Sequence, residues 1–208
     1  MFHILRLRPL DLFILSLQLK QITSQSIIMK RALLEILYTA LLAIVLFFVL
    51  NSMVQNFRIN GTSMMPNLEN GQYVLVNKAA YWFGHEPERG DIIVLHAPET
   101  DEKLDRIKLI IGLPGDTVHV NDDGTVIING IPVDEPYITP KTGGTTGTWT
   151  VPEGKYFVLG DNRSVSYDSR SWLFLPREDI IGKAWFIIWD LNDIGRVPNY
   201  DLELESSV

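Results

Sequence analysis

Residues 36–54 read ILYTALLAIVLFFVLNSMV, nineteen consecutive residues without a charged side chain. A helix of this length extends roughly 28 Å, close to the ~30 Å thickness of the hydrocarbon core of a bilayer. Lys30 and Arg31 stand immediately before the stretch, whereas Arg58 is the nearest cation after it. Because Lys and Arg flank the cytoplasmic side of a membrane span, we expect a transmembrane anchor over residues 30–54 with its N-terminal side in the cytoplasm.

A cleavable signal peptide is the alternative interpretation of this stretch. Its apolar region would be shorter, about 7–15 residues, and an A-x-A cleavage site would follow, which is missing here. Residues 1–29 are apolar but interrupted by charges and by Pro9, so we do not expect a second span there. We interpret them as a cytoplasmic extension, either a segment at the membrane interface or the product of a start codon misplaced upstream of Met29.

The sequence after the anchor is typical of a β domain. Short runs rich in Val, Ile and aromatic residues alternate with clusters of Gly, Pro, Asn and Asp. These runs cover residues 73–76, 91–95, 117–120, 125–128, 155–159 and 184–189. Asn121–Gly124 and Asn129–Gly130 are typical hairpin turns, and a short helix is expected only within 68–82. We therefore expect a mainly β fold, an antiparallel domain over residues 55–200 after a single transmembrane helix, and an acidic tail over 201–208.

Composition excludes several classes of protein. The chain carries 18 Lys and Arg against 25 Asp and Glu, a net charge of -7, so it lacks the basic surface of a nucleic-acid-binding protein. It contains no Cys, which excludes thiol catalysis and disulfides, and only four dispersed His, which argues against a zinc site. We therefore expect no metal, no cofactor and no nucleic-acid partner.

Three segments place reactive residue types among turn-forming residues. The first, Gly61–Leu68 (GTSMMPNL), surrounds the Ser63 hydroxyl with residues that restrict the backbone. In the second, Asp105–Asp116 (DRIKLIIGLPGD), Lys108 stands inside an apolar run. The third, Gly160–Arg170 (GDNRSVSYDSR), is dense in small polar and charged residues. Taken singly, each is also typical of a surface loop, or of a strand whose Lys faces solvent.

An inward-facing Lys108 would have distinctive chemistry. Burial disfavours the charged ammonium form and lowers the pKa of an amine. Bringing that pKa from ~10.4 to near 8 requires roughly 3 kcal/mol, which burial can supply. The neutral amine could then act as a general base toward a serine hydroxyl.

Together these motifs resemble the type I signal peptidases, the membrane-bound Ser–Lys leader peptidases of peptidase family S26. The resemblance rests on four boxes in order: SMxP at 63–66, RGD at 89–91, KxxxGLPGD at 108–116 and GDNRxxSxDSR at 160–170. It implies a signal-peptidase-like antiparallel β catalytic domain. It also implies a serine endopeptidase that cleaves signal peptides from exported preproteins after small residues at -1 and -3.

The resemblance implies a role for each matching residue. Ser63 is the expected nucleophile and Lys108 the expected general base, with Ser166 hydrogen-bonded to the Lys amine. Asp168 and Arg170 are expected to form an ion pair that shapes the loop carrying Ser166. Their role is therefore supporting rather than chemical.

The same resemblance implies an oxyanion hole and substrate contacts. The oxyanion hole is expected at the backbone N–H of Ser63, with help from the Gly61–Thr62 turn. Some family members have a Ser where this chain has Gly61, so a side-chain donor, if there is one, would be Thr62. The expected substrate-binding residues are Ile59, Met64, Leu68 and Ile107.

The chain departs from the usual pattern of the family at three positions near the boxes. Asn67 stands in place of a Thr, Leu109 in place of an Arg, and Arg106 where an aromatic residue is common. The last change alters one wall of the expected substrate groove. None of the three touches the Ser–Lys pair.

The anchor implies a place and partners for this activity. The catalytic domain is expected outside the plasma membrane, close to the bilayer and to the export machinery from which signal peptides emerge; a thylakoid membrane is the alternative. Two other functions compete: another Ser–Lys peptidase of the same fold, such as a self-cleaving repressor or a pilus-processing enzyme, and a tethered β domain that binds peptides without cutting. The anchor argues against a repressor, and the presence of Ser63 and Lys108 argues against an inactive domain.

Overall fold

The computed structural model describes residues 9–98, 104–138, 145–189, 193–200 and 202. The chain divides into two compact units, Met1–Asn51 and Ser52–Val208. The predicted acidic tail therefore lies outside the described residues, except for Leu202, which is buried in the core of the second unit.

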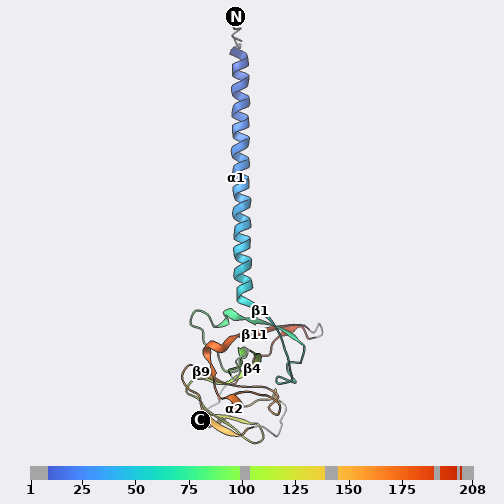
Figure 1. Ribbon diagram of the computed structural model, residues 1–208, viewed down its shortest axis with the longest axis vertical. Coiled ribbons are helices and arrows are strands. Elements are labelled where there is room, and N and C mark those ends of the chain that lie inside the picture. Colours follow the sequence, from blue (N-terminus) through green and yellow to red (C-terminus); the bar gives the residue numbers. More distant parts are fainter. Residues whose placement is uncertain (1–8, 99–103, 139–144, 190–192, 201, 203–208) are drawn as a thin grey trace. The chain divides into compact units, whose positions relative to one another are not determined.

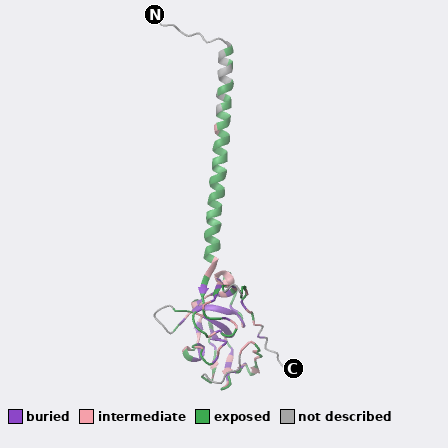
Figure 2. Ribbon diagram, turned by 90° about the vertical axis from the view of Figure 1, so that its right-hand side faces the viewer, coloured by how far each residue is buried: buried purple, intermediate pink, exposed green. Residues whose placement is uncertain are grey.

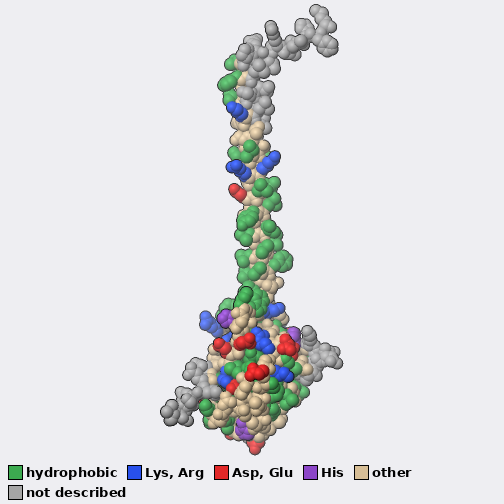
Figure 3. Space-filling model, turned by 90° about the vertical axis from the view of Figure 1, so that its left-hand side faces the viewer, with side chains coloured by type: hydrophobic (Ala, Val, Ile, Leu, Met, Phe, Trp, Pro, Cys, Tyr) green, Lys and Arg blue, Asp and Glu red, His purple; other side chains and the backbone are tan. Residues whose placement is uncertain are grey.

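The first unit is one helix, α1 (Pro9–Met53), whose described side chains are largely exposed (Figure 2). Among the described residues, Thr23–Met53 is the single helical stretch long and apolar enough to cross a membrane. Figure 3 shows the apolar side chains that cover it. The described helix extends further toward the N-terminus than the predicted anchor, as far as Pro9. It ends before Val54, which starts the first strand.

The second unit is a mainly β domain, as predicted, built on two antiparallel sheets (Figure 1). The larger sheet has the order β1-β2-β11-β3-β4-β9-β10, with β12 paired to β11. Its strands are β1 (Val54–Arg58), β2 (Tyr73–Asn77), β3 (Ile92–His96), β4 (Asp105–Gly112), β9 (Lys155–Leu159), β10 (Leu175–Pro176), β11 (Ile180–Trp189) and β12 (Gly195–Arg196).

The smaller sheet has the order β7-β6-β5-β8. Its strands are β5 (Thr117–Val120), β6 (Val126–Ile128), β7 (Ile131–Pro132) and β8 (Gly147–Thr150). The two predicted hairpin turns join β5 to β6 and β6 to β7. In the second turn Asn129 and Gly130 both adopt positive φ, 53° and 84°, which matches the twist that a two-residue hairpin needs.

Helices of the domain are short: η1 (Lys78–Tyr81), α2 (Ser169–Trp172) and η2 (Arg177–Asp179). The helix expected within 68–82 is therefore wrong except for the single 3-10 turn of η1. The apolar run of residues 73–77 forms strand β2 instead, because both of its edges pair, one with β1 and the other with β11.

Strand β4 is buried on both faces. Ile107, Leu109 and Ile111 pack into the main core, whereas Ile110 packs into a second cluster with Ile93. Since side chains alternate along a strand, Lys108 lies on the face of Ile110, and it is only 2% exposed. The alternative in which this Lys faces solvent is thereby excluded.

Candidate active site

Ser63 and Lys108 lie in direct contact. Lys108 Nζ donates a hydrogen bond to Ser63 Oγ at 2.7 Å and another to the carbonyl oxygen of Ile107 at 3.0 Å. The lysine comes from the middle of β4, and the serine from the turns between β1 and β2. An amine in contact with a hydroxyl at this distance can exchange a proton with it.

The loop that carries Ser63 is held in place by apolar anchors. Ile59, Met64 and Leu68 are at most 2% exposed and pack into the main core. Backbone hydrogen bonds of 2.9 Å close the loop, from the N–H of Ile59 to Gln72 and from the N–H of Leu68 to Met64. The serine is therefore held on a rigid turn, which fits its predicted role as nucleophile.

A second loop, residues 160–168, packs directly against the loop that carries Ser63. The N–H of Asn162 donates to the carbonyl of Ser63 at 2.9 Å, and the Asn162 side chain donates to the carbonyl of Thr62 at 3.2 Å. Gly160 has no side chain at the point of closest approach. A Cβ there would lie 2.5 Å from the Ser63 carbonyl oxygen and 2.3 Å from Ser166 Oγ.

The predicted hydrogen bond between Ser166 and Lys108 is not formed. Ser166 Oγ is buried and makes no hydrogen bond with any described residue. Its side chain lies against Gly160, beside the backbone of Ser63. The Ser166 hydroxyl therefore lies next to the loop that carries Ser63 and makes no hydrogen bond there.

Asp168 and Arg170 form the expected ion pair. Arg170 Nε and Nη2 each donate to a carboxylate oxygen of Asp168 at 2.9 Å. Asp168 also accepts from the N–H of Gly160 at 3.1 Å. Arg170 donates to the carbonyls of Arg163 and Ser166 at 2.7 and 3.3 Å, so the pair ties both ends of the loop together.

A cleft of about 430 Å³ opens above the Ser–Lys pair. Of the four predicted substrate-binding residues, Ile107 lines it, whereas Ile59, Met64 and Leu68 are buried in the main core and are not among its lining residues. The other lining residues come from β1 and the loop that carries Ser63, from β4 and the residue before it, and from the second loop: Phe57, Asn60, Gly61, Thr62, Ser63, Leu104, Asp105, Arg106, Lys108, Val165 and Tyr167.

The predicted oxyanion hole is partly open to a ligand. Among the described residues, the N–H of Ser63 has no hydrogen-bond acceptor. The N–H of Gly61, in contrast, donates to Asn70 Oδ1 at 2.9 Å. Gly61 therefore shapes the turn, with φ of 105°, and its own N–H is already used.

Comparison with known proteins gives one consistent result. A sequence model of the family described as signal peptidase, peptidase S26, matches residues 30–189. The chain belongs to this peptidase family.

Relatives of this signal peptidase family member include a signal peptidase I of Leptolyngbya laminosa, 40% identical over 81% of this chain and 87% of the relative. One from Bacillus licheniformis is 37% identical over 79% and 93% of the two chains. A signal peptidase IB of Staphylococcus aureus is 39% identical over 79% and 94%. A solved signal peptidase I from Enterococcus faecalis is 36% identical, with a TM-score of 0.42 over 47% of this chain and 96% of that one.

Two of the family boxes hold the sheets together outside the cleft. In the RGD box, Arg89 donates to Asp116 Oδ2 of the GLPGD box at 2.9 Å and to the carbonyl of Ile111. Asp91 accepts hydrogen bonds from Lys183 and, at 2.7 Å, from the Tyr81 hydroxyl. We assign these side chains a structural role, because none of them lines the cleft.

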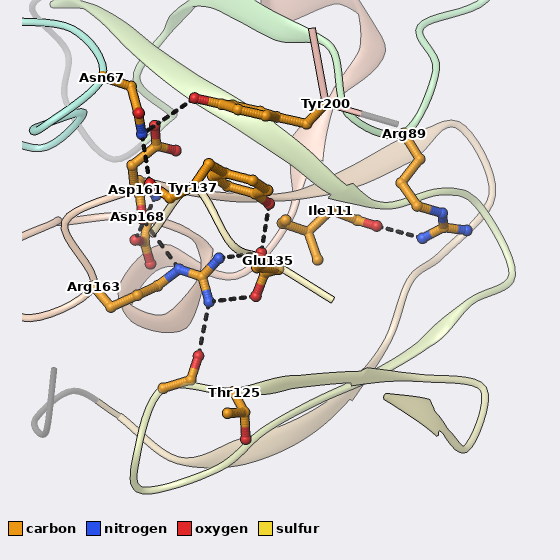
Figure 4. A network of polar contacts seen from close by, with 12 residues as sticks. Asn67, Arg89, Ile111, Thr125, Glu135, Tyr137, Asp161, Arg163, Asp168 and Tyr200 are labelled. Atoms are coloured by element: carbon orange, nitrogen blue, oxygen red, sulfur yellow. Dashed lines mark hydrogen bonds and ion pairs between the residues drawn. The ribbon is translucent and has the colours of Figure 1, made fainter. Parts of the chain in front are cut away.

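A buried polar network, which sequence reasoning missed, connects the two loops of the site (Figure 4). Asn67, at the end of the SMxP segment, donates to Asp161 Oδ2 at 2.8 Å, and the Tyr200 hydroxyl approaches the same oxygen at 3.4 Å. The other oxygen of Asp161 has no hydrogen-bond partner among the described residues. Burial raises the pKa of Asp161 to about 6.

The same network continues into the smaller sheet. Arg163, 1% exposed, forms a two-pronged ion pair with Glu135, one hydrogen bond of which measures 3.0 Å. It also donates to the carbonyl of Gly124 in the β5–β6 turn at 2.8 Å. Tyr137 stacks on Tyr200 with ring centres 3.6 Å apart. The only sequence signal for this network was the GDNR box, whose Asp and Arg had no assigned role.

Proposed function

We propose that this chain removes signal peptides from exported preproteins, cutting after small residues at -1 and -3, with Ser63 as nucleophile and Lys108 as general base. The observation that carries the proposal is the 2.7 Å contact between Lys108 Nζ and Ser63 Oγ at the floor of a cleft. Family membership supports the reaction class.

Proton transfer begins the reaction. Because burial penalises the ammonium form, Lys108 can act as a neutral amine that takes the proton from Ser63 Oγ. The oxygen then attacks the carbonyl carbon of the scissile peptide bond, and the resulting oxyanion accepts a hydrogen bond from the N–H of Ser63, with Thr62 as a second donor.

Breakdown of this intermediate completes the cut. Lys108 returns its proton to the leaving amine, so the peptide C–N bond breaks and the signal peptide stays on Ser63 as an ester. Water, deprotonated by the same amine, attacks the ester carbonyl and releases the signal peptide and the free serine. In our proposal Ser166 binds the Lys108 amine when that amine leaves Ser63.

The apolar helix supports a position for this reaction. In our proposal α1 anchors the enzyme in the plasma membrane, with its N-terminal side in the cytoplasm and the domain outside. Ser63 follows Val54 by only nine residues, so the nucleophile is tethered near the bilayer and the export machinery. Protease protection of residues 55–200 in inverted vesicles tests this orientation; digestion of the domain from the cytoplasmic side would overturn it.

The decisive experiment is cleavage of a preprotein with an A-x-A site by the full chain in detergent. We expect wild type to cut after the -1 residue, and Ser63→Ala and Lys108→Ala each to lose activity by about a thousandfold or more. Lys108→Arg should not restore activity, because a guanidinium stays protonated.

The matched control is Lys155→Ala, since Lys155 is exposed on β9, outside the cleft lining. It should cleave like wild type. Cleavage by Lys108→Ala at the wild-type rate, in protein with a native circular dichroism spectrum, would exclude the lysine as base. Failure of folded wild type to cut any such preprotein would instead favour a tethered binding domain.

A further inference from the structure

Asn162, in the second loop, binds two successive carbonyl groups of the loop that carries Ser63. Its side-chain Nδ2 donates to the carbonyl oxygen of Thr62 at 3.2 Å, and its backbone N–H donates to that of Ser63 at 2.9 Å. The side-chain contact has no part in the reaction proposed above, although it acts on the peptide unit that joins Thr62 to Ser63.

The two ends of this peptide unit are linked by covalent geometry. A peptide unit is planar, and in its trans form the C=O and N–H bonds point in opposite directions. The carbonyl of Thr62 and the N–H of Ser63 belong to one unit, so a hydrogen bond that holds the carbonyl also sets the direction of the N–H. That N–H is the proposed oxyanion donor, and it has no acceptor among the described residues.

The two ends also have different surroundings. Thr62 and Ser63 line the cleft, whereas Asn162 does not. The Asn162 amide therefore binds the carbonyl end from outside the cleft lining, and the N–H end stays available to a substrate. A hydrogen bond to the carbonyl also polarises the peptide unit, which strengthens its N–H as a donor.

The orientation of the Asn162 amide is itself restricted. Its Oδ1 accepts a hydrogen bond from Ser164 Oγ at 2.9 Å, so Nδ2 is the atom that faces Thr62. The backbone carbonyl of Asn162 accepts from the N–H of Ser166 at 3.0 Å. The amide is thus held at both of its polar atoms, and its backbone is anchored within the second loop.

We propose that Asn162 is a positioning residue of the oxyanion hole, which directs the N–H of Ser63 toward the developing oxyanion without touching the substrate. The inference rests on the proposed function and adds to it a residue of the second loop. The N–H of Met65 also donates to the Thr62 carbonyl, at 3.3 Å, so the peptide unit keeps one support without Asn162. Loss of a whole oxyanion donor lowers kcat by roughly 100- to 1000-fold, and we expect the loss of one of two supports to lower it about tenfold.

The test measures kcat, KM and the pH profile of the full chain in detergent on a peptide with an A-x-A site. Asn162→Ala removes the amide and keeps the backbone hydrogen bond to Ser63. We expect kcat to fall about tenfold and KM to stay within about twofold of wild type, because the oxyanion forms only in the transition state. The pH profile should match that of wild type, since the variant leaves the Lys108 amine in place.

Two inhibitors separate the direction of the N–H from a general loosening of the site. A peptide aldehyde with the A-x-A sequence adds to the serine: Ser63 Oγ bonds to the aldehyde carbon, the carbonyl electron pair moves to its oxygen, and the hydroxyl proton passes to the Lys108 amine. The matching peptide alcohol binds in the cleft without forming this bond. Asn162→Ala should weaken inhibition by the aldehyde about tenfold and leave inhibition by the alcohol unchanged.

Asn162→Asp is the second variant, because it keeps the shape of the side chain and loses the donor. Compared at the pH plateau of the rate, it should show the same selective loss, so the test holds even where Asn162→Ala does not fold. The matched control is Asn121→Asp in the β5–β6 turn. Asn121 donates through the same atom to Thr125 Oγ1 at 2.7 Å and does not line the cleft, so this variant should behave like wild type.

The inference and the proposed function fail on different results. Wild-type kcat in the folded Asn162 variants, or an equal loss of inhibition by aldehyde and alcohol, would reduce Asn162 to a residue that packs the loop, and the proposed function would stand. If folded wild type neither cuts the peptide nor responds to the aldehyde, the proposed function itself fails.

Discussion

Asp161 has a buried carboxyl group that forms no ion pair with the described residues. Its ionised form is therefore disfavoured in the folded state. Its pKa is raised to about 6, mainly by desolvation, whereas hydrogen bonds from Asn67 and Tyr200 oppose the shift. The folded state therefore holds this proton more tightly than the unfolded chain does. The contribution of Asp161 to stability is fully present below about pH 4 and is lost as the pH rises through about 6.

We expect Asp161→Asn to remove this loss, because an amide can accept the same hydrogen bonds without a charge. Between about pH 4.5 and about pH 7.5, the free energy of unfolding of the variant should gain about 2 kcal/mol relative to wild type. Urea denaturation of both proteins at the two pH values measures the difference. A difference that does not change with pH would mean that Asp161 is not protonated in the folded state.

Ser166 does not form its predicted hydrogen bond with the Lys108 amine. Its role in the reaction can be tested directly. If its hydroxyl binds the Lys108 amine during proton transfer, Ser166→Ala should lower kcat about tenfold, with KM nearly unchanged and the pH profile displaced. Ser166→Thr, which keeps the hydroxyl, should recover part of the rate. A variant with wild-type kcat would reduce Ser166 to a packing residue beside Gly160.

At the scale of elements, Arg163 and Glu135 attach the second loop to the smaller sheet. Both side chains are at most 4% exposed, so each charge depends on the other. We expect Arg163→Met to lower the free energy of unfolding by about 3–5 kcal/mol, because it leaves the Glu135 carboxylate buried without a partner.

Addition of Glu135→Leu to Arg163→Met is the informative control. The double variant removes both charges and should recover much of the lost stability, as measured by chemical denaturation. Equal destabilisation of the single and double variants would indicate that the hydrogen bond of Arg163 to the β5–β6 turn, and not the ion pair, carries the effect.

Elements differ in how far sequence alone predicts them. Strands β2, β3, β5, β6 and β9 have runs of β-branched and aromatic residues, and each lies within a residue or two of its predicted position. Strands β7, β10 and β12 have two residues each, too few to show a period. The residues of the site also differ in how far sequence predicts them. Ser63 and Lys108 stand in recognisable sequence boxes. The hydrogen bond between Asn67 and Asp161 joins residues 94 positions apart, so no local sequence pattern predicts it.

At the scale of the whole molecule, we expect α1 to serve as the membrane anchor and the β domain to fold independently of it. Among the residues that the structure describes, the buried apolar side chains all lie between Phe57 and Leu202, within the second unit. We expect the chain without residues 1–51 to unfold within about 3 °C of the full chain, as followed by circular dichroism. A collapse of the melting temperature would show that α1 contributes to folding.

The anchor should matter for where the enzyme meets its substrate. Against a short soluble peptide, the chain without residues 1–51 and the full chain should have similar kcat/KM, because both keep the same cleft. Against a preprotein inserted in vesicles that also hold the full chain, the anchored enzyme should be about 10- to 100-fold faster, since confinement to one membrane raises the effective concentration. Equal rates on the vesicle-bound preprotein would mean that the domain finds the membrane without its helix.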